Sequence, residues 1–335
     1  MLWLNEVLLY HQDQKIIYKE GEKMAAKRDL RKNNFFMNLA KNKTLLFMLM
    51  PAVIYYFIFS YIPMIGSVVA FKRYNYTDGL FGSPWTGFDN FKFLFANGKI
   101  FKVALNTIAY NIAFIIVNQI LQIASAIFLS EINSKSFKKV SQSVMFFPYF
   151  ISWVIVGGFM YNFFNYDFGS LNTLLKSIGF KPVDIYSNAG IWKYIIIAIN
   201  AWKNVGYGTV VYLASITGID KELYESAEID GAGKFAKTFF ITLPLMVPQI
   251  VILILLSIGN IFRGDFDMFY QVTGNNPLLY DSTDVIDTFV VRSLLQIQDI
   301  GMSSAAGLAQ SIVCFVILIV ANTLVRKYQE NYALF

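Results

Sequence analysis

Two neighbouring aspartates, Asp265 and Asp267, are the side chains of this sequence best suited to acid–base chemistry. Paired carboxyl groups cleave glycosidic bonds, one acting as the acid and the other as a base or nucleophile. Side chains two positions apart diverge on a helix, however, so these two carboxyl groups would not face one substrate. The spacing therefore favours an ordered loop cap or a polar gate over a catalytic pair.

Other common chemistries lack their residues. The sequence holds one histidine, His11, and one cysteine, Cys314. A His-based triad, a multi-histidine zinc site and an intrachain disulfide are therefore excluded within this chain. The phosphate-binding pattern G-x-x-x-x-G-K-[ST] is absent from the sequence, so a P-loop site for ATP hydrolysis is not expected on this chain. No cofactor or metal is expected here. On these residues alone, a polytopic membrane enzyme acting on glycans or lipids and a membrane scaffold remain as hypotheses.

The composition is that of a membrane protein. Hydrophobic residues make up 56% of the 335 residues and charged residues 15%, against about 25% charged in soluble domains. The 32 phenylalanines and 20 tyrosines suit lipid-facing surfaces and interfacial belts. The net charge of +6 does not indicate nucleic-acid binding, because the basic residues flank apolar segments and form no stripe on a soluble domain.

Six apolar stretches are long enough to cross a bilayer, which takes about 20 residues. Lipid cannot satisfy exposed backbone polar groups, so each must be a helix. Proline is tolerated in such helices and often kinks them. We therefore predict an all-α integral membrane protein with six transmembrane helices and kinks near Pro51, Pro63, Pro148 and Pro248. The stretches lie near 44–70, 105–130, 141–164, 191–215, 243–262 and 304–325.

The distribution of Lys and Arg predicts the orientation. Residues 1–43 are polar and basic and do not resemble a secretory signal, although Met24 is an alternative start to Met1. Further basic residues lie in the loops at 131–140 and 216–242 and after the last stretch. Cytoplasmic loops carry the excess of Lys and Arg. We therefore expect a cytoplasmic segment 1–43, one membrane domain over 44–330, and both termini in the cytoplasm of a plasma-membrane protein.

The loop at 216–244 has the strongest local pattern. Residues 221–230 predict a short amphipathic helix, with Glu222, Glu225 and Glu228 at spacings of three. Gly231 and Gly233 then permit a sharp turn, since glycine accepts positive φ. A second helix, which carries Lys234 and Lys237, follows. A solvated connector remains possible, but the length favours a docking surface for a cytoplasmic partner.

Polar residues within apolar stretches are functional candidates because they are expensive to bury in lipid. Amides and aromatic rings bind sugars through hydrogen bonds to hydroxyls and through stacking on ring faces. Hydrogen bonding between helices is the alternative role. The candidates for a substrate pathway are Trp202, Asn204, Tyr207, Asn260, Phe262 and Asp265.

Within the 216–244 loop, Glu225-Ser226-Ala227 followed by Asp230-Gly231-Ala232 resembles the EAA loop of ABC importer permeases. Ser226 stands where the family pattern has its first alanine, a small-for-small change. Further segments, such as Tyr61-Ile62-Pro63-Met64 and Gly82-Ser83-Pro84-Trp85, resemble the maltose-type, LplB-like branch that takes up oligosaccharides.

The resemblance implies a type I ABC importer permease fold in which 216–244 is the coupling loop that inserts into a groove on an ATPase. Glu225 would pair with a basic residue of that ATPase, and Gly231 would turn the loop. The expected partners are a second related permease, two cytoplasmic ATPase subunits that bind ATP and Mg²⁺, an extracellular substrate-binding protein and a carbohydrate substrate. The implied function is uptake of a sugar or oligosaccharide, without chemistry on this chain.

Overall fold

The computed structural model describes residues 42–96 and 98–335. The predicted cytoplasmic segment 1–43, including His11 and Met24, lies outside the described residues except for its last two. The chain divides into two compact units, 1–66 and 67–335. Each unit is described by itself.

In the first unit, one apolar helix fills the described part. It consists of α3 (Lys43–Tyr56), the π-helical turn η1 (Phe57–Tyr61) and α4 (Ile62–Met64). The helical path from Lys43 to Phe71 is long and apolar enough to cross a membrane. Large apolar side chains are exposed along it, including Phe47 at 79%. Such a surface is stable only against lipid or another protein.

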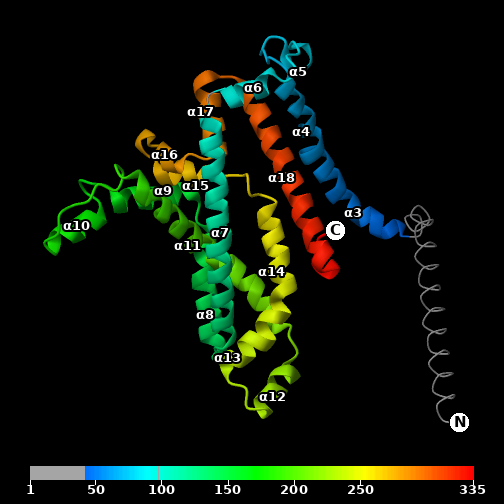
Figure 1. Ribbon diagram of the computed structural model, residues 1–335, viewed down its shortest axis with the longest axis vertical. Coiled ribbons are helices and arrows are strands. Elements are labelled where there is room, and N and C mark those ends of the chain that lie inside the picture. The colour runs from blue at the N-terminus through cyan, green and yellow to red at the C-terminus, as the bar shows by residue number, and fades with distance from the viewer. Residues whose placement is uncertain (1–41, 97) are drawn as a thin grey trace. The chain divides into compact units, whose positions relative to one another are not determined.

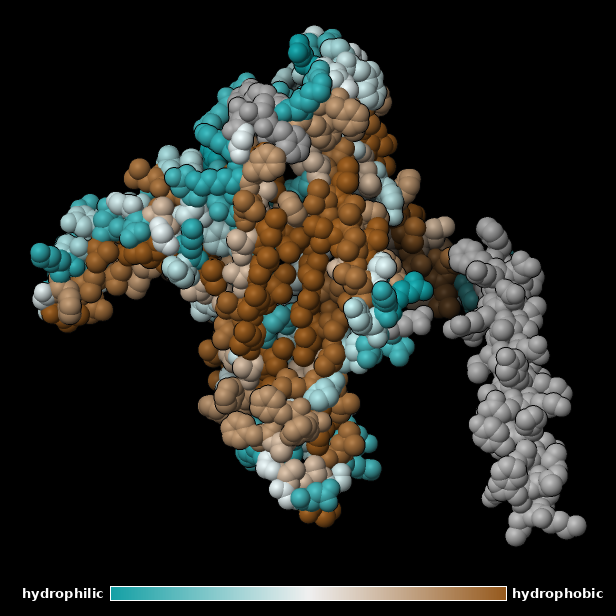
Figure 2. Space-filling view, in the orientation of Figure 1, coloured by the Kyte–Doolittle hydropathy of each residue, from teal (hydrophilic) through white to brown (hydrophobic). Residues whose placement is uncertain are grey.

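Four long helices form the frame of the second unit (Figure 1). They are α7 (Lys99–Ser130), α11 (Ala189–Thr217), α14 (Leu243–Ile258) and α18 (Ile300–Tyr328). α14 continues from α13 (Lys234–Lys237) through the π-helical turn η4 (Thr238–Thr242), so this apolar helix begins at Lys234. A band of hydrophobic side chains covers the long helices, with hydrophilic residues above and below it (Figure 2).

The predicted span 141–164 is broken. α8 (Lys135–Phe146) and the 3-10 turn η3 (Phe147–Phe150) meet α9 (Trp153–Phe164) at 92°. Pro148 lies in the turn, as the expected kink requires. Lys203 of α11 is buried at 8% exposure and donates to the carbonyl oxygens of Pro148 (3.2 Å), Tyr149 (2.9 Å) and Ile151. One ammonium group thus satisfies the carbonyls that the break frees.

Four helices are long and apolar enough to cross a membrane, or five if the bent pair counts as one span. α11 has 29 residues but is not among them, because its polar residues lower its mean hydropathy. The predicted all-helical class is confirmed: the described residues contain no strand, only an isolated bridge between Lys72 and Trp85. The structure thus has several helices that could cross a membrane, but the predicted number of six is not confirmed.

Short helices lie between the long ones and after the last of them. They are η2 (Ile65–Phe71), α5 (Gly79–Gly82), α6 (Asp89–Ala96), α10 (Ser170–Ser177), α12 (Lys221–Ile229), α15 (Phe266–Thr273), η5 (Pro277–Leu279), α16 (Tyr280–Thr283), α17 (Ile286–Ile297) and η6 (Glu330–Tyr332).

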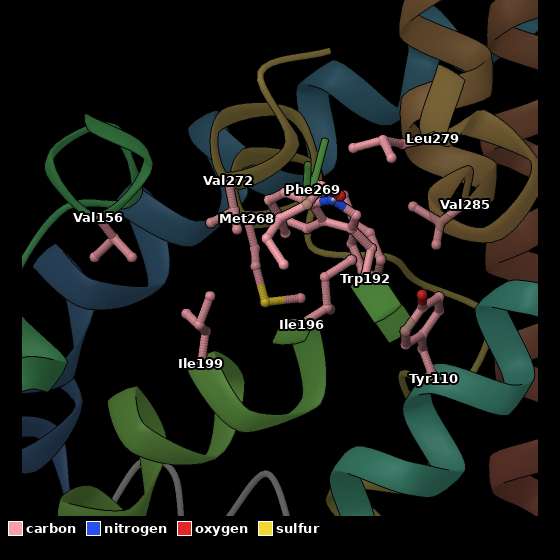
Figure 3. Close-up of a cluster of buried hydrophobic side chains, with 11 residues drawn as sticks. Tyr110, Val156, Trp192, Ile196, Ile199, Met268, Phe269, Val272, Leu279 and Val285 are labelled. Carbon is pink, nitrogen blue, oxygen red and sulfur yellow. Dashed lines mark hydrogen bonds between the residues drawn. The ribbon is translucent and has the colours of Figure 1, made fainter. Parts of the chain in front are cut away.

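Three apolar clusters hold the second unit together, and two of them pack α7 against α11. In the larger, Trp192 and Ile196 of α11 pack against Met268 and Phe269 of α15 and Tyr110 of α7 (Figure 3). In the other, Tyr212 and Leu213 of α11 meet Ala126 and Leu129 of α7 and Met246 of α14. Between these clusters, residues 111–122 of α7 and 200–208 of α11 carry polar side chains. The polar segments of α7 and α11 therefore lie between two regions of apolar packing.

Candidate functional site

A cavity of about 440 Å³ lies between α7, α11 and the end of α14, at these polar segments. No charged side chain is among its lining residues, whereas seven of them carry amides. An amide offers both donors and acceptors, so the lining can match hydroxyl groups on a ligand. The lining residues are Asn111, Phe114, Ile115, Asn118, Gln119, Gln122, Asn200, Asn204, Tyr207, Gly208, Leu253, Leu256, Ser257 and Asn260.

α7 supplies one wall of the cavity. Asn111, Asn118 and Gln122 are separated by seven and four residues, which places them on one helix face. The Asn118 amide donates to Asn200 Oδ1 at 2.9 Å, and the Gln122 amide donates to the Asn204 carbonyl at 3.1 Å. Asn118 Oδ1 is buried and has no donor among the described residues. This acceptor is available to a ligand or a water molecule.

α11 supplies the opposite wall. The side-chain amide of Asn204 donates to the Asn200 carbonyl at 2.9 Å. A side chain at Gly208 would place its Cβ 2.0 Å from Gln122 Oε1, so glycine is what lets Gln122 approach α11. Tyr207 is 47% exposed, and its ring stacks on Tyr149 with centroids 5.0 Å apart. The cavity is therefore bordered by an aromatic face as well as by amides.

The end of α14 closes the third side. The predicted span 243–262 stops being helical at Ile258, and a turn follows. Within the turn, the Asn260 amide donates to the Leu256 carbonyl at 3.1 Å. Asn111 of α7 donates to the carbonyl oxygens of Ile261 and Arg263, each at 3.0 Å. A side chain from α7 thus fixes the turn that brings Asn260 to the cavity.

Three of the six predicted pathway residues, Asn204, Tyr207 and Asn260, line this cavity. The other three, Trp202, Phe262 and Asp265, are not among its lining residues. Sequence reasoning missed the polar stripe on α7. The signal was present, since polar residues recur on one face of an otherwise apolar helix.

Asp265 is a helix cap, as its position indicated. It is the N-cap of α15, and its Oδ1 accepts from the Met268 backbone N–H at 3.0 Å. Its Oδ2 accepts from Trp153 Nε1 at 2.8 Å. Asp267 lies in the first turn of the same helix. Both oxygens of Asp265 are thus engaged in positioning α9 and α15.

The coupling loop has the predicted helix–turn–helix form. α12 begins after its N-cap Asp220, which accepts from the Glu222 N–H at 3.1 Å. At its end the Ala232 N–H donates to the Ala227 carbonyl (2.8 Å) and the Gly231 N–H to the Glu228 carbonyl (3.0 Å). These two bonds form a Schellman motif, with Gly231 at φ +82°. The predicted positive φ at Gly231 is confirmed.

Three contacts hold this loop in place. Tyr224 Oη lies 2.9 Å from Thr242 Oγ1, Glu228 pairs with Lys237 at 2.8 Å, and Lys234 pairs with Glu131 at 3.1 Å. The hydrogen bond from Lys237 and its positive charge lower the pKa of Glu228, so the Glu228 carboxyl group is ionised at neutral pH.

The rest of α12 faces solvent. Glu225 is exposed and has no hydrogen bond or ion pair with any described residue. Ser226, Asp230, Gly231 and the apolar Ile229 are exposed as well, and Ile229 is 88% accessible. The loop therefore offers a preformed surface on which the carboxylates of Glu222, Glu225 and Asp230 have no partner among the described residues. Such a surface suits a separate chain rather than the packing of this one.

Comparison with known proteins gives a consistent picture. The family model described as "Binding-protein-dependent transport system inner membrane component" matches residues 122–330. Protein LplB of Bacillus subtilis (strain 168) is 32% identical over 293 residues, which cover 88% of this chain and 92% of that protein. The polygalacturonan/rhamnogalacturonan transport system permease protein YteP of the same organism is 32% identical over 308 residues, covering 91% and 94%.

Among solved structures, a chain of a bacterial ABC transporter involved in the import of the acidic polysaccharide alginate superposes with a TM-score of 0.78 and 32% identity. The match covers 88% of this chain and 99% of that one. A related structure contains the alginate transporter in complex with an alginate pentasaccharide-bound periplasmic protein, with a TM-score of 0.77. These proteins share both sequence and fold with the chain.

Proposed function

Because the chain belongs to the family of binding-protein-dependent transport system inner membrane components, we propose that it is the permease subunit of an ABC importer for a sugar or oligosaccharide. The resemblance to maltose-type importer permeases is thereby confirmed. The chain is a multi-pass membrane protein, and the named relatives with printed functions are permeases for carbohydrates.

The amide-lined cavity carries this proposal. Its level along α7 and α11 is polar, although apolar clusters pack above and below it. Asn204, Tyr207 and Asn260 would contact sugar hydroxyls and ring faces, together with Asn118 and Gln122. We propose that Trp202, Phe262 and Asp265 serve the pathway less directly, Asp265 by fixing the start of α15 against Trp153.

The free energy for transport would come from ATP hydrolysis on other subunits. We propose that the coupling loop docks on one of two cytoplasmic ATPase subunits, which bind ATP and Mg²⁺, while this chain contributes no ATPase site. Six residues of the loop would form the contact: Glu225, Ser226, Ala227, Asp230, Gly231 and Ala232. The unpaired Glu225 and the Schellman turn at Gly231 support this role. A second related permease and an extracellular substrate-binding protein would complete the importer.

The coupling role also fixes an orientation. We propose six spans: the four apolar helices, the bent α8–α9 pair and α11. Both termini and the coupling loop then lie in the cytoplasm, which agrees with the cluster of Lys and Arg in these segments.

The hypothesis of a membrane enzyme has less support. It rested on Asp265 and Asp267, and both carboxylate oxygens of Asp265 accept hydrogen bonds that hold the fold in place. A general acid or base must instead reach the proton that it transfers.

Asn260→Ala tests the cavity. Loss of one hydrogen bond costs about 0.5–1.5 kcal/mol, so uptake should fall by about two- to twelvefold at unchanged membrane abundance. Asn162→Ala is a matched control. Asn162 is also exposed and its amide also donates to the carbonyl four residues earlier, but it lies on α9 outside the cavity lining. Equal uptake by both variants would refute a cavity role for Asn260.

A further inference from the structure

The segment between α9 and α11, residues 165–188, projects sideways from the long helices and contains α10 (Figure 1). We refer to it as the α10 arm. Its base is anchored in the larger apolar cluster, where Ile185 is 7% exposed. Trp192 Nε1 donates to the Ile185 carbonyl at 2.9 Å. The arm is thus rooted at the start of α11.

A single buried amide makes the arm rigid. Asn172 is 1% exposed. Its Nδ2 donates to the carbonyl oxygens of Tyr166 (3.2 Å) and Val183 (3.0 Å), and its Oδ1 accepts from the Val183 N–H (2.8 Å). The outgoing and returning limbs are therefore tied together. Because the limbs are closed on each other, the faces of the arm point in fixed directions.

The two faces differ in chemistry. Leu171, Leu174 and Leu175 share one side of α10, and Thr173 and Lys176 lie on the other. Figure 2 shows the arm hydrophilic on top and hydrophobic beneath, with the hydrophobic side at the height of the hydrophobic band on the long helices. The exposed apolar side chains of the arm are Tyr166 (46%), Phe168 (57%), Leu174 (60%), Ile178 (59%), Phe180 (65%) and Val183 (40%).

We propose that the α10 arm lies in the bilayer interface, with Leu174, Ile178 and Phe180 among the acyl chains and Lys176 and Lys181 at the headgroups. α11 runs from the arm to the coupling loop, so the leaflet concerned is the one away from α12. Apolar and aromatic residues on one face with lysines on the other are typical of helices that lie in a membrane surface. The arm would extend the lipid-facing surface of the spans sideways.

Lipid fits this face better than a protein partner does. A specific protein interface carries about one hydrogen bond per 100–200 Å². Five of the six exposed apolar side chains are Leu, Ile, Phe or Val, which offer no donor or acceptor, and the sixth, Tyr166, has one hydroxyl, which suits the headgroup region. They also continue the hydrophobic band of membrane-crossing helices rather than forming a separate patch.

The test is site-specific fluorescence quenching in the assembled transporter. Cys314, the only cysteine, is replaced by alanine, and a cysteine at position 174 (Leu174→Cys) is labelled with a polarity-sensitive dye. The complex is placed in nanodiscs of phosphatidylcholine and phosphatidylglycerol, with or without a nitroxide near the top of the acyl chain. Thr173→Cys, one residue away and on the polar face, is the matched control.

The label at 174 should lose most of its fluorescence to the lipid nitroxide and little to aqueous iodide, and the label at 173 should show the reverse. Quenching of the 174 label by iodide would place the arm in water and overturn the proposal. Protection from both quenchers would assign the face to a protein subunit and overturn it as well. Phe180→Cys replaces Leu174→Cys if that variant fails to assemble. The measurement needs no transport, so it stands apart from the identity of the substrate.

Discussion

The coupling loop is shaped by hydrogen bonds between residues close together in the sequence, whereas the cavity is shaped by hydrogen bonds between residues far apart in it. In the loop, the hydrogen bonds that set the turn join residues three and five positions apart, Gly231 to Glu228 and Ala232 to Ala227. In the cavity, Asn118 and Asn200 meet across 82 positions of sequence. The loop is therefore shaped by local bonds, whereas the cavity exists only once α7 and α11 are packed.

The two regions also differ in whether their polar side chains are hydrogen-bonded within the chain. Most cavity amides already bond within the chain, as Gln122 does with Asn204 and Asn111 with Ile261. Glu225 of the coupling loop bonds to no described residue. A substitution in the cavity should thus disturb the chain's own packing, whereas one at Glu225 should disturb only an association with another chain. Four predictions test this contrast, from the largest expected effect to the smallest.

Gly206→Ala should give the largest effect, because it should remove most of the folded protein and with it every function of the chain. A Cβ at this position would lie 2.0 Å from the backbone oxygen of Met145, so α11 would have to move away from α8. Overpacking of this kind costs about 1–3 kcal/mol and occasionally more. We expect a lower thermal midpoint in detergent and loss of most folded protein. Gly158→Ala is the control, because nothing lies within 4 Å of its added Cβ. Equal stability of the two variants would mean that α8 and α11 separate easily.

Glu225→Ala should leave the folded chain intact and weaken its association with the ATPase. Removing one partner of a close interfacial charge pair costs about 2–5 kcal/mol, or roughly thirtyfold in affinity at the lower limit. Glu228→Ala is the comparison, since Glu228 lies on the same helix but pairs with Lys237 in its own chain. Co-purification of the ATPase and substrate-stimulated hydrolysis measure the difference. If Glu228→Ala proved the more damaging, the docking role would belong to another face of α12.

Gly231→Val should uncouple hydrolysis from uptake. A left-handed backbone costs a residue with a side chain about 1–2 kcal/mol, so a shift of about five- to thirtyfold in coupling is expected. Gly233→Val is matched for space, because neither glycine has a neighbour within 4 Å of an added Cβ. Gly233 has φ −71°, however, which valine accepts. The ratio of ATP hydrolysed to sugar imported should rise only in the first variant. A rise in both would point to the valine side chain rather than to the turn.

Asn118 and Asn200 should show the smallest effect. Their hydrogen bond of 2.9 Å is worth about 0.5–1.5 kcal/mol. A double-mutant cycle with alanine at each position should therefore give a coupling energy of about 1 kcal/mol in thermal or denaturant unfolding. Additive effects of the two single changes would indicate that each amide bonds independently to water or ligand.

The difference in sequence separation between the interacting residues of the coupling loop and those of the cavity also explains which features could be predicted from the sequence. Glu222, Glu225, Glu228 and Gly231 lie within ten residues, and they predicted α12, its turn and the helix that follows. Half of the predicted pathway residues reach the cavity, since polar positions on α11 and α14 stand out in apolar runs. The α7 stripe is as regular, but nothing local indicates that it faces α11 rather than another subunit. The break after Phe150 depends on Lys203, which lies more than fifty positions later in the chain.

The buried Lys203 also bears on how the chain enters the membrane during synthesis. A lysine at the centre of a helix costs about 2.5–3.5 kcal/mol on insertion scales, and α11 is correspondingly poor in hydropathy. Its three acceptors, the carbonyls of Pro148, Tyr149 and Ile151, lie on a segment that leaves the ribosome first. We therefore expect α11 to partition into the bilayer only against an already inserted α8–α9 pair, so that biogenesis follows the order of the chain.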